Sequence, residues 1–355
     1  MEIKRSLKNI LVSGGAGFIG GNFIRMMLER RAGFQGRIIN FDALTYAGNA
    51  ASLDGVAGKY GGRYVFEHAD IRDRAAVERV FAEYDVDTVV HFAAETHVDR
   101  SIVRPDDFVT TNVIGTFTLL EAARLAWRNE DGSMRGDALF HQVSTDEVYG
   151  SLGEEGCFSE TTAYAPCSPY SASKAGADHL VAAYHHTYGL PVTLSACSNN
   201  YGPYQFPEKL IPLMIMNMLD GKALPVYGDG KNVRDWIFVE DHNRAVALIL
   251  ERGRTGEKYN IGGENEWENL KLLDTLIRIA ANKTGRDAKE IERTIRFVPD
   301  RPGHDRRYAI DCSKIKRELG WRQSVSFEEG LEKTIDWYIE NRHNYTAGGA
   351  CSSNV

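Results

Sequence analysis

The first 200 residues alternate short apolar runs with segments of helical periodicity, and this alternation restricts the possible folds more than any other feature. The apolar runs do not alternate with polar residues, which predicts strands buried on both faces. Strands joined by helices form a parallel sheet that helices cover on both sides. The sequence therefore predicts an α/β domain with a doubly wound parallel sheet. Its predicted strands are residues 9–13, 37–41, 64–67, 88–92, 138–144 and 192–196, and its predicted helices are 18–30, 73–83, 106–128 and 169–188.

The pattern changes after the sixth predicted strand, where a loop-like segment begins a second region. In this region short strands are predicted at 225–227 and 236–239, and helices at 241–251, 269–283 and 326–340. We expect residues 1–198 to form the sheet domain, with about 234–262 returning to it, and residues 199–340 to form mainly a smaller α+β lobe that binds the substrate. The small, polar residues 341–355 are expected to be disordered, and the polar segment 128–137 to be a surface loop.

Composition and charge exclude several classes of function. With 355 residues, the chain is long enough for two domains or for one enlarged α/β domain. Its formal net charge of −7 argues against general nucleic-acid binding. No apolar run reaches the roughly 18 residues that a membrane helix needs, and the first apolar run is too short for a signal peptide. The five cysteines are scattered and lack zinc spacing, so we expect reduced thiols, no metal site and a cytoplasmic protein.

A glycine loop follows the first predicted strand directly. Gly14, Gly17 and Gly20 have the spacing G-x-x-G-x-x-G and lead into the first predicted helix. Glycines let the turn approach a pyrophosphate, while the N–H groups at the start of the helix bind it. The glycines alone would also fit an ordinary tight turn. Their position between strand and helix favours a Rossmann-type dinucleotide site.

The second predicted strand leads to Asp42, which lies 22 residues past Gly20. A carboxylate at this place can bind both ribose hydroxyls of the adenosine and would repel a 2′-phosphate, which favours NAD over NADP. After the third strand, Asp70 and Ile71 could lie beside the adenine. For Asp70 the alternative is a helix N-cap, and the residues alone leave both open.

Tyr170 and Lys174 are four residues apart in a helix that Ser168 is expected to cap and Pro169 to begin. Positions i and i+4 share one helix face, so the ammonium is expected to lie beside the phenol. A neighbouring cation lowers the pKa of a tyrosine, which would make Tyr170 an acid/base group. The alternative is a pair of exposed surface residues.

Thr145, Asp146 and Glu147 follow the fifth predicted strand, at the edge of the sheet where ligands of such folds bind. Thr145 can hydrogen-bond a substrate hydroxyl that faces Tyr170. One protonated and one ionised carboxyl would form an acid/base pair for an elimination. The alternative is a solvated loop that caps a helix.

Together these motifs resemble the extended, nucleotide-sugar-modifying branch of the short-chain dehydrogenase/reductase superfamily. Within this branch the chain is similar to the dTDP-glucose 4,6-dehydratases over roughly residues 8–340. The motifs that carry this resemblance are Gly-Gly-Ala-Gly-Phe-Ile-Gly (14–20), Asp-Ala-Leu-Thr-Tyr-Ala-Gly (42–48), Ala-Ala-Glu-Thr-His-Val-Asp-Arg-Ser-Ile (93–102), Ser-Thr-Asp-Glu-Val-Tyr-Gly (144–150), Tyr-Ser-Ala-Ser-Lys (170–174), residues 199–212, Arg-Asp-Trp (234–236) and Arg-Pro-Gly-His-Asp-Arg-Arg-Tyr (301–308).

The resemblance implies a hydro-lyase reaction in which the hydride moves from C4 of the glucose to NAD⁺ and back to C6. It implies that Tyr170 takes the proton of the 4-hydroxyl while Thr145 orients that hydroxyl. Glu147 would remove the C5 proton, and Asp146 would protonate the leaving C6 hydroxyl. The product would be dTDP-4-keto-6-deoxy-glucose, which feeds rhamnose and other deoxysugar biosynthesis.

The resemblance also implies contacts to both ligands. The residues that would line NAD, besides Gly14, Gly17 and Gly20 of the loop, are Phe18, Ile19, Asp42, Leu44, Thr45, Asp70, Ile71, Ala93, Ala94, Thr111, Tyr170, Lys174 and Asn200. The residues that would hold the nucleotide sugar are Thr96, Asn199, Lys209, Leu210, Pro225, Tyr227, Arg234, Asn269, Arg301, His304 and Tyr308. Arg234 suits a diphosphate, although a surface salt bridge fits the residue equally well.

Helices 106–128 and 169–188 carry more apolar residues than one buried face needs, which indicates a subunit interface or burial under the second lobe. The resemblance implies a homodimer through a four-helix bundle of these helices. The residues behind this expectation are Val109, Val113, Phe117, Leu120, Leu125, Ala175, Leu180 and Tyr184.

Two other functions fit part of the sequence. A UDP-sugar 4-epimerase or another nucleotide-sugar dehydratase would share the fold, NAD and the Tyr170/Lys174 pair, but the adjacent Asp146 and Glu147 speak against an epimerase. A non-catalytic NAD-binding sensor would be expected to have lost these catalytic side chains. Physics alone does not identify the base of the nucleotide.

Overall fold

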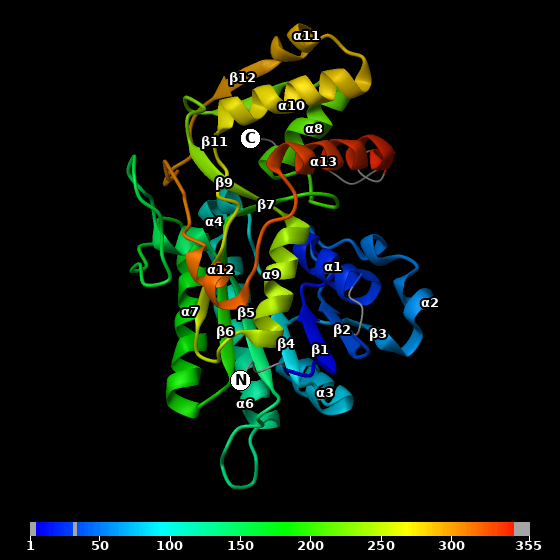
Figure 1. The fold of residues 1–355 in the computed structure, drawn as a ribbon, viewed down its shortest axis with the longest axis vertical. Coiled ribbons are helices and arrows are strands. Elements are labelled where there is room, and N and C mark those ends of the chain that lie inside the picture. Colours follow the sequence, from blue (N-terminus) through cyan, green and yellow to red (C-terminus); the bar gives the residue numbers. More distant parts are fainter. Residues whose placement is uncertain (1–4, 31–33, 344–355) are drawn as a thin grey trace.

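The computed structural model describes residues 5–30 and 34–343. At its centre is a seven-stranded parallel sheet of order β10-β6-β5-β4-β1-β2-β3 (Figure 1). The order reverses between β1 and β4, and this switch point is where doubly wound sheets bind their ligands. The six predicted strands are all present, and β10 is added to them. The strands are β1 (Asn9–Ser13), β2 (Arg37–Asp42), β3 (Tyr64–His68), β4 (Thr88–His91), β5 (Leu139–Thr145), β6 (Val192–Cys197) and β10 (Lys258–Ile261).

Helices cover both faces of this sheet, which explains why the central strands are apolar throughout. Along β1, Ile10 and Val12 pack into one core cluster, and Leu11 packs into the other. Since successive side chains of a strand point to opposite faces, one short apolar run supplies both cores. The first face is covered by α1 (Phe18–Arg25), α9 (Val239–Arg252) and α12 (Ser313–Leu319), and the second by α3 (Arg74–Tyr84), α6 (Thr116–Ala126) and α7 (Pro169–Tyr188).

The predicted helix 106–128 is interrupted in the structure. It consists of α5 (Pro105–Phe108), a π-helical stretch η4 (Val109–Gly115) and then α6. Within η4 the side chain of Asn112 leaves the helix to bond neighbouring segments, and the Thr116 hydroxyl donates to the Asn112 carbonyl oxygen at 2.6 Å. Such side-chain bonds bend a helix and favour π-helical turns. The predicted helix 18–30 is likewise α1 followed by a π-helical stretch (Met26–Arg30).

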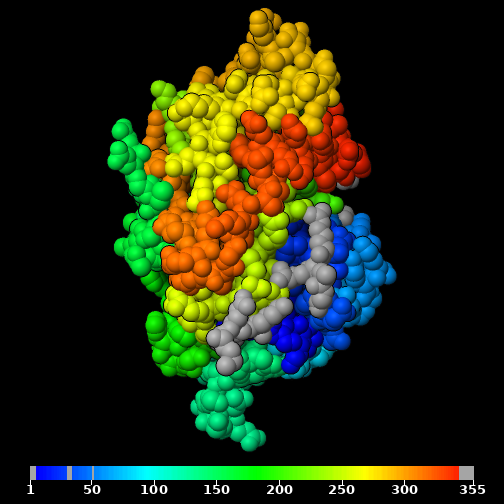
Figure 2. Space-filling view, in the orientation of Figure 1, coloured from blue at the N-terminus to red at the C-terminus, as the bar shows by residue number. Residues whose placement is uncertain are grey.

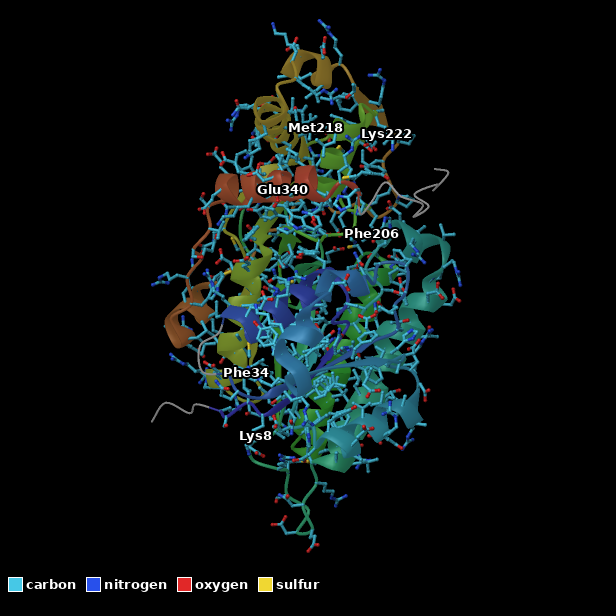
Figure 3. All side chains as sticks on the ribbon, turned by 90° about the vertical axis from the view of Figure 1, so that its right-hand side faces the viewer. Lys8, Phe34, Phe206, Met218, Lys222 and Glu340 are labelled. Carbon is cyan, nitrogen blue, oxygen red and sulfur yellow. The ribbon has the colours of Figure 1, made fainter. Side chains whose placement is uncertain are left out.

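The second region forms a lobe above the sheet domain (Figures 1 and 2). It contains the three-stranded sheet β11-β9-β7 and the two-stranded sheet β12-β8. Four helices of the lobe enclose a hydrophobic core that is separate from the cores of the sheet domain. Met218, Lys222 and Glu340 lie in this lobe, and Phe206 lies at its junction with the sheet domain (Figure 3). Its elements are β7 (Asn199–Tyr201), α8 (Leu210–Asp220), β8 (Leu224–Tyr227), β9 (Val233–Phe238), β11 (Glu266–Glu268), α10 (Asn269–Thr284), α11 (Ala288–Glu292), β12 (Ile295–Val298) and α13 (Phe327–Asn341).

The segment expected to return to the sheet domain, 234–262, is divided between the two regions. Its strand β10 pairs with β6 in the main sheet, and α9 covers that sheet. Its first strand, β9, pairs instead with β7 and β11 outside the main sheet. The segment therefore crosses between the lobe and the sheet domain.

Several short elements had no clear periodicity in the sequence. The helix α8 is apolar on all sides because the lobe core surrounds it, so it lacks the amphipathic pattern of a surface helix. The segment 128–137 projects as an exposed hairpin closed by a bridge between Arg128 and Met134 (Figure 1). The remaining helices are α2 (Val56–Tyr60) and α4 (Val98–Val103), and single 3-10 turns are formed by Ala50–Leu53, Gly61–Arg63 and Asp146–Tyr149.

A buried carboxylate fixes the lobe to the sheet domain. Asp241 of α9 is fully buried, and its carboxylate accepts hydrogen bonds from Ser324 N at 3.1 Å and Val325 N at 3.0 Å. These residues precede α13, so their hydrogen bonds to Asp241 set the direction in which α13 leaves the sheet domain. Helix α13 ends at Asn341, and most of the tail expected to be disordered, residues 344–355, lies outside the described residues. Within the described part of the chain, no helix is long and apolar enough to cross a membrane.

Candidate active site

The glycine loop packs directly against the segment that follows β4. Gly14 has a positive φ of 71°, and a Cβ on it would lie 2.6 Å from Ala93 N. A Cβ on Gly20 would lie 2.3 Å from Gly14 O. No larger residue fits these two places without a backbone shift, so the loop keeps a close turn beneath the start of α1. The sequence predicts that the N–H groups at this helix start, at Phe18 and Ile19, bind a pyrophosphate.

Asp42 is the last residue of β2 and is buried against the glycine loop. Its carboxylate accepts Ala16 N at 2.9 Å and Leu44 N at 2.8 Å. Burial raises its pKa, and these two hydrogen bonds oppose the shift. Each oxygen keeps further lone pairs for ribose hydroxyls. Thr45 is exposed in the same turn.

For Asp70 the structure excludes one of the two alternatives, the helix N-cap, and the contact of Asp70 and Ile71 with adenine stays a prediction. The N-cap of α3 is Asp73, whereas Asp70 forms an ion pair with Arg72 at 2.6 Å. Ile71 is buried and packs against Gly115 of η4, where a Cβ would approach its side chain to 2.4 Å. Ile71 therefore contributes to the core beneath the predicted adenine position.

The loop after β4 and the stretch η4 complete this side of the cleft. Ala93 and Ala94 are half-buried after β4, and Thr111 is half-buried in η4. Asn200 of β7 donates to the carbonyl oxygen of Ser198 at 3.1 Å. Its own side-chain oxygen has no hydrogen-bond partner among the described residues.

Tyr170 and Lys174 lie on the first two turns of α7, which Ser168 caps through a capping box with Ser171. Both side chains are buried. The Lys174 ammonium donates to the carbonyl oxygen of Val143 at 2.8 Å, and burial lowers its pKa. The alternative of an exposed surface pair is therefore wrong.

The pKa of Tyr170 differs from the expectation. It lies well above the usual value, because burial disfavours the phenolate and the charge of Glu147 adds to that effect. A hydrogen bond with Thr145 opposes the shift. The structure thus places Thr145 beside the phenol, while the ammonium of Lys174 is held by β5.

Thr145 ends β5, and Asp146 and Glu147 begin the 3-10 turn that follows. The Thr145 hydroxyl lies 3.3 Å from Asp146 Oδ1 and accepts Glu147 N at 3.3 Å. Asp146 is 2% exposed, and its Oδ2 has no partner among the described residues. This burial excludes the alternative of a solvated loop.

The two carboxyls have different surroundings. Burial raises the pKa of Asp146 well above its usual range, and the nearby carboxyls of Glu147 and Asp235 raise it further. Burial also raises the pKa of Glu147, but the charges of Arg301, Arg234 and Lys209 oppose that shift. This difference favours a protonated Asp146 beside an ionised Glu147, which is the arrangement of an acid/base pair.

Three cations from different segments surround Glu147. The buried Arg234 of β9 donates to the carbonyl oxygens of Val233 at 2.8 Å and Asp305 at 2.9 Å. Lys209 donates to the carbonyl oxygen of Thr96 at 2.7 Å. Arg301 lies 3.4 Å from a carboxylate oxygen of Asp99. Because the partners of Arg234 and Lys209 are neutral carbonyls, their charges stay available for an anionic ligand.

The other predicted substrate residues lie around these cations or on the lobe. Tyr227 donates to Asp99 at 3.4 Å, and Tyr308 donates to Asp305 at 2.5 Å while its ring stacks with Arg234. His304 pairs with Asp300 at 2.6 Å. Leu210 packs against the lobe core, and Pro225 lies in β8. Buried polar atoms without a described partner occur on Asn199, Asn269 and Arg301.

Sequence reasoning missed several polar residues at the same sheet edge. The side chain of Asn112 bonds the main chain of Glu95 at 2.9 and 3.0 Å and donates to Ser173 at 2.8 Å, which ties η4 to α7. An asparagine inside an apolar helical segment was the available signal. Asp178 of α7 and Cys197 of β6 are also buried near Lys174. Nothing in their local sequence pattern sets them apart from core residues.

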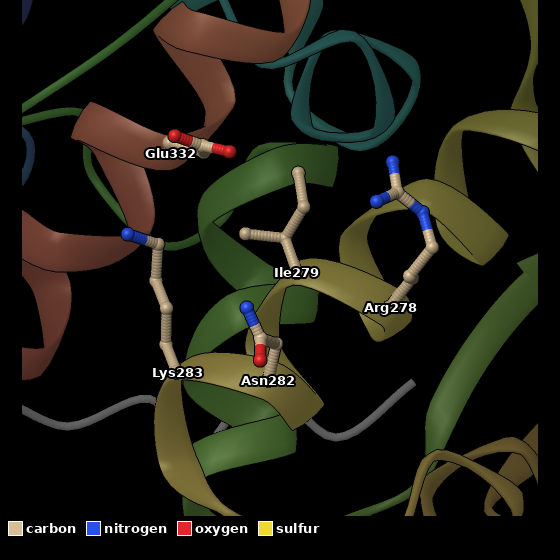
Figure 4. Close-up of a pocket in the computed structure, with 5 residues that line it drawn as sticks. All are labelled: Arg278, Ile279, Asn282, Lys283 and Glu332. Carbon is tan, nitrogen blue, oxygen red and sulfur yellow. The ribbon is translucent and has the colours of Figure 1, made fainter.

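The structure contains two notable hollows. One of about 190 Å³ lies beside the glycine loop, between Gly17, Tyr46 and Phe206. Another of about 440 Å³ lies between α10 and α13 on the outer lobe, and Figure 4 shows its charged rim of Arg278, Lys283 and Glu332. None of the predicted site residues lines this second pocket. In the described ranges, no cluster of three or more metal-ligating side chains is present.

This chain has a doubly wound sheet with a Tyr/Lys pair at its carboxyl edge and a glycine loop at its switch point. Together these features define the class of short-chain dehydrogenases/reductases.

Comparison with known proteins narrows this class. The sequence matches the family model of GDP-mannose 4,6 dehydratase over residues 11–334. A dTDP-glucose 4,6-dehydratase of Neisseria gonorrhoeae is 54% identical over 339 residues, which cover 94% of this chain and 96% of that protein. The chain therefore belongs to this family of 4,6-dehydratases.

Solved structures agree with this assignment. A dTDP-glucose 4,6-dehydratase from Streptomyces venezuelae, crystallised with NAD bound, has a TM-score of 0.85 at 47% identity and covers 96% of this chain and 100% of that chain. A UDP-glucose 4-epimerase from Thermotoga maritima has a TM-score of 0.81 at 30% identity, with 94% and 99% covered. Both backbones are similarly close to that of this chain, so the fold does not separate a dehydratase from an epimerase. The higher sequence identity to the dehydratase does.

The raised pKa of Asp146 predicts a pH-dependent loss of stability. A carboxyl whose pKa is higher in the folded than in the unfolded chain destabilises the fold as pH rises above the unfolded pKa of about 3.9. Asp146→Asn removes this effect and should raise the free energy of unfolding measurably at pH 7. The gain should shrink toward pH 4. Urea unfolding at several pH values measures it, with the exposed Asp54→Asn as the control. Equal stability of the Asp146 variant and the native chain at pH 7 would contradict the analysis.

Proposed function

We propose that this protein converts dTDP-glucose to dTDP-4-keto-6-deoxy-glucose and water, with NAD as a cofactor that is regenerated in each cycle. The observation that carries this proposal is the triplet Thr145-Asp146-Glu147, which lies beside Tyr170 at the carboxyl edge of β5. The relatives of highest identity quoted above are dTDP-glucose 4,6-dehydratases. An epimerase does not eliminate water, so it has no step that needs a carboxyl acid/base pair in addition to the Tyr/Lys pair.

The residues of the predicted dinucleotide site fit NAD. Gly14 and Gly20 leave a cradle that a Cβ would fill, and Asn200 offers an unpartnered buried oxygen. Asp42 would bind the ribose hydroxyls. Bound NAD supplies the acceptor for the hydride from C4 and the donor of the hydride to C6.

The protein side chains would handle the protons. Tyr170 would take the proton of the 4-hydroxyl as a phenolate, with Thr145 sharing the hydrogen bond. Because burial disfavours this form, the positive charges of the Lys174 ammonium and of NAD⁺ would have to stabilise it. The resulting 4-ketone acidifies the C5 proton, which Glu147 would remove. Asp146, kept protonated by burial, would give its proton to the C6 hydroxyl so that water leaves. When the hydride returns to C6, Glu147 would give its proton back to C5, which completes the product. Arg234, Lys209 and Arg301 would hold the diphosphate and keep Glu147 ionised.

One coarser feature agrees with a cytoplasmic enzyme. Among the described residues, Cys157, Cys167, Cys197 and Cys312 are free thiols, which supports a reducing compartment.

The test of the function is incubation of the purified protein with dTDP-glucose and, separately, UDP-glucose, without added reductant. We expect mass spectrometry to show the loss of one water from dTDP-glucose alone. Loss of water from UDP-glucose instead would identify another nucleotide-sugar dehydratase. Conversion of UDP-glucose to UDP-galactose, detected by NMR, would identify an epimerase, and no reaction with either sugar would contradict the proposal.

Variants of the two proton-transfer groups should fail at different steps. Glu147→Gln should still oxidise C4 but slow the exchange of the C5 proton roughly 10²–10⁴-fold. Tyr170→Phe should prevent the first oxidation, so that no reduced nicotinamide absorbance develops on addition of substrate. Deuterium incorporation at C5 by NMR separates the two. Unchanged incorporation in Glu147→Gln, or normal nicotinamide reduction in Tyr170→Phe, would refute the corresponding role.

We also propose a homodimer through a four-helix bundle of α6 and α7. Of the residues predicted for it, Val109, Phe117 and Leu125 are exposed. Leu120, Ala175 and Tyr184 are buried in the chain's own core, so their apolar character has a different cause. The exposed large apolar side chains on α4, η4, α6 and α7 are Ile102, Val103, Val109, Ile114, Phe117, Leu125 and Tyr188.

Phe117→Asp tests this interface because a carboxylate in an apolar contact is unfavourable. We expect light scattering to show a dimer for the native chain and a monomer for the variant. Phe66→Asp is the matched control, since Phe66 on the edge strand β3 is 38% exposed and Phe117 is 41% exposed. A monomeric native chain, or dissociation by both variants, would refute the proposed interface.

A further inference from the structure

Lys174 needs a counter-charge that the proposed mechanism does not provide. It is 4% exposed, and its ammonium bonds a neutral carbonyl oxygen. Burial favours the neutral amine, as its lowered pKa indicates. Stabilising the phenolate of Tyr170, the role that the Tyr/Lys spacing predicts for Lys174, requires the ammonium form. A negative charge nearby would therefore decide whether Lys174 stays protonated.

The groups that face Lys174 come from three packed elements. His91 of β4 is neutral because burial lowers its pKa to about 3. Cys197 of β6 remains a thiol because burial raises its pKa to about 12. Asp178 lies one turn further along α7 on the same helix face as Lys174 and is 2% exposed. Of these groups, Asp178 is the one that can supply an anion. Burial raises its pKa, whereas the charge of Lys174 and the hydrogen bonds from Ser144 and Tyr164 oppose that shift and favour the carboxylate.

The carboxylate of Asp178 also joins three segments of the site. Its Oδ2 accepts the Ser144 hydroxyl at 2.6 Å and the Tyr164 hydroxyl at 2.8 Å. Ser144 immediately precedes Thr145 on β5, and Tyr164 lies in the loop that leads to α7. The end of β5 and the loop before α7 are thus both hydrogen-bonded to one carboxylate oxygen of α7.

A second cation shares this carboxylate. Lys258 of β10 faces Asp178, lies 3.5 Å from the Tyr164 hydroxyl, and stands 4.8 Å from the ring centroid of Tyr149. Glu160 also faces Lys258. The charges of both Lys174 and Lys258 therefore act on the carboxylate of Asp178.

We propose that Asp178 is a positioning residue for the reaction: its charge keeps Lys174 an ammonium, and its two hydrogen bonds hold Thr145 beside Tyr170. This inference rests on the proposed function for its catalytic consequence, whereas the charge effect on Lys174 is a property of the folded chain itself.

Three substitutions separate charge from hydrogen bonding. Asp178→Asn keeps an oxygen acceptor for Ser144 and Tyr164 but removes the charge. Ser144→Ala and Tyr164→Phe each remove one hydrogen bond and keep the charge. Lys258→Met removes the second cation and should act on Lys174 in the opposite sense to Asp178→Asn.

The direct readout is the titration of the Lys174 Cε resonance in protein with ¹³C-labelled lysine, assigned by its absence in Lys174→Met. We expect the midpoint to fall by about one pH unit or more in Asp178→Asn and to rise in Lys258→Met. It should stay in place in Ser144→Ala and Tyr164→Phe. If Asp178→Asn does not fold, the direction in which Lys258→Met moves the Lys174 midpoint still tests the proposal. Unmoved midpoints in both charge variants would overturn the proposal.

Turnover supplies the second readout. The alkaline limb of kcat should move to lower pH in Asp178→Asn and to higher pH in Lys258→Met. In Ser144→Ala and Tyr164→Phe, kcat should fall severalfold with the limb in place. A uniform loss of kcat at all pH values in Asp178→Asn would indicate a merely structural residue. A native enzyme that does not dehydrate dTDP-glucose would instead refute the proposed function, and the NMR titration would still test the charge effect.

Discussion

Parallel pairing of β5 between β4 and β6 is the constraint on which the site depends. Because all strands of the sheet run in one direction, Ser13, His91, Thr145 and Cys197 end at one edge. The residues that follow them form the glycine loop, the 93–96 segment, the acid/base triplet and the start of the lobe. Helix α7 then brings Tyr170 and Lys174 to the same edge through its first two turns. One hydrogen-bonding pattern thus gathers groups separated by more than 180 residues.

The site concentrates groups that are unfavourable for folding. Asp146, Tyr170, Lys174 and Asp178 are all nearly fully buried, and Asp146 Oδ2 and Asp178 Oδ1 lack partners among the described residues. Burial disfavours the charged form of each group. Such an arrangement lowers the stability of the fold, and shifted pKa values of this kind are typical of sites that transfer protons. The apolar clusters on both faces of the sheet hold this edge in shape.

The sequence predicted the sheet and the constellation well, since both depend on local patterns. Strand runs, the capping box of α7 and the spacing of Tyr170 and Lys174 are all contained within a few residues. The interruption of the 106–128 helix was not predictable, because it arises from contacts of Asn112 with Glu95 and Ser173, which are distant in sequence. The raised pKa of Tyr170 was missed for the same reason, since it depends on burial and on Glu147. Helix α8 lacked a periodic signal because the lobe core surrounds it.

The exposed hairpin at 128–137 lies just before the amino end of β5, whereas Thr145 lies at the carboxyl end. A seven-residue strand separates the two by roughly 20 Å. The hairpin therefore offers an attachment point for a tether, a fluorophore or an affinity handle. A protein immobilised there would present the sheet edge that carries Thr145 to the solution, away from the support.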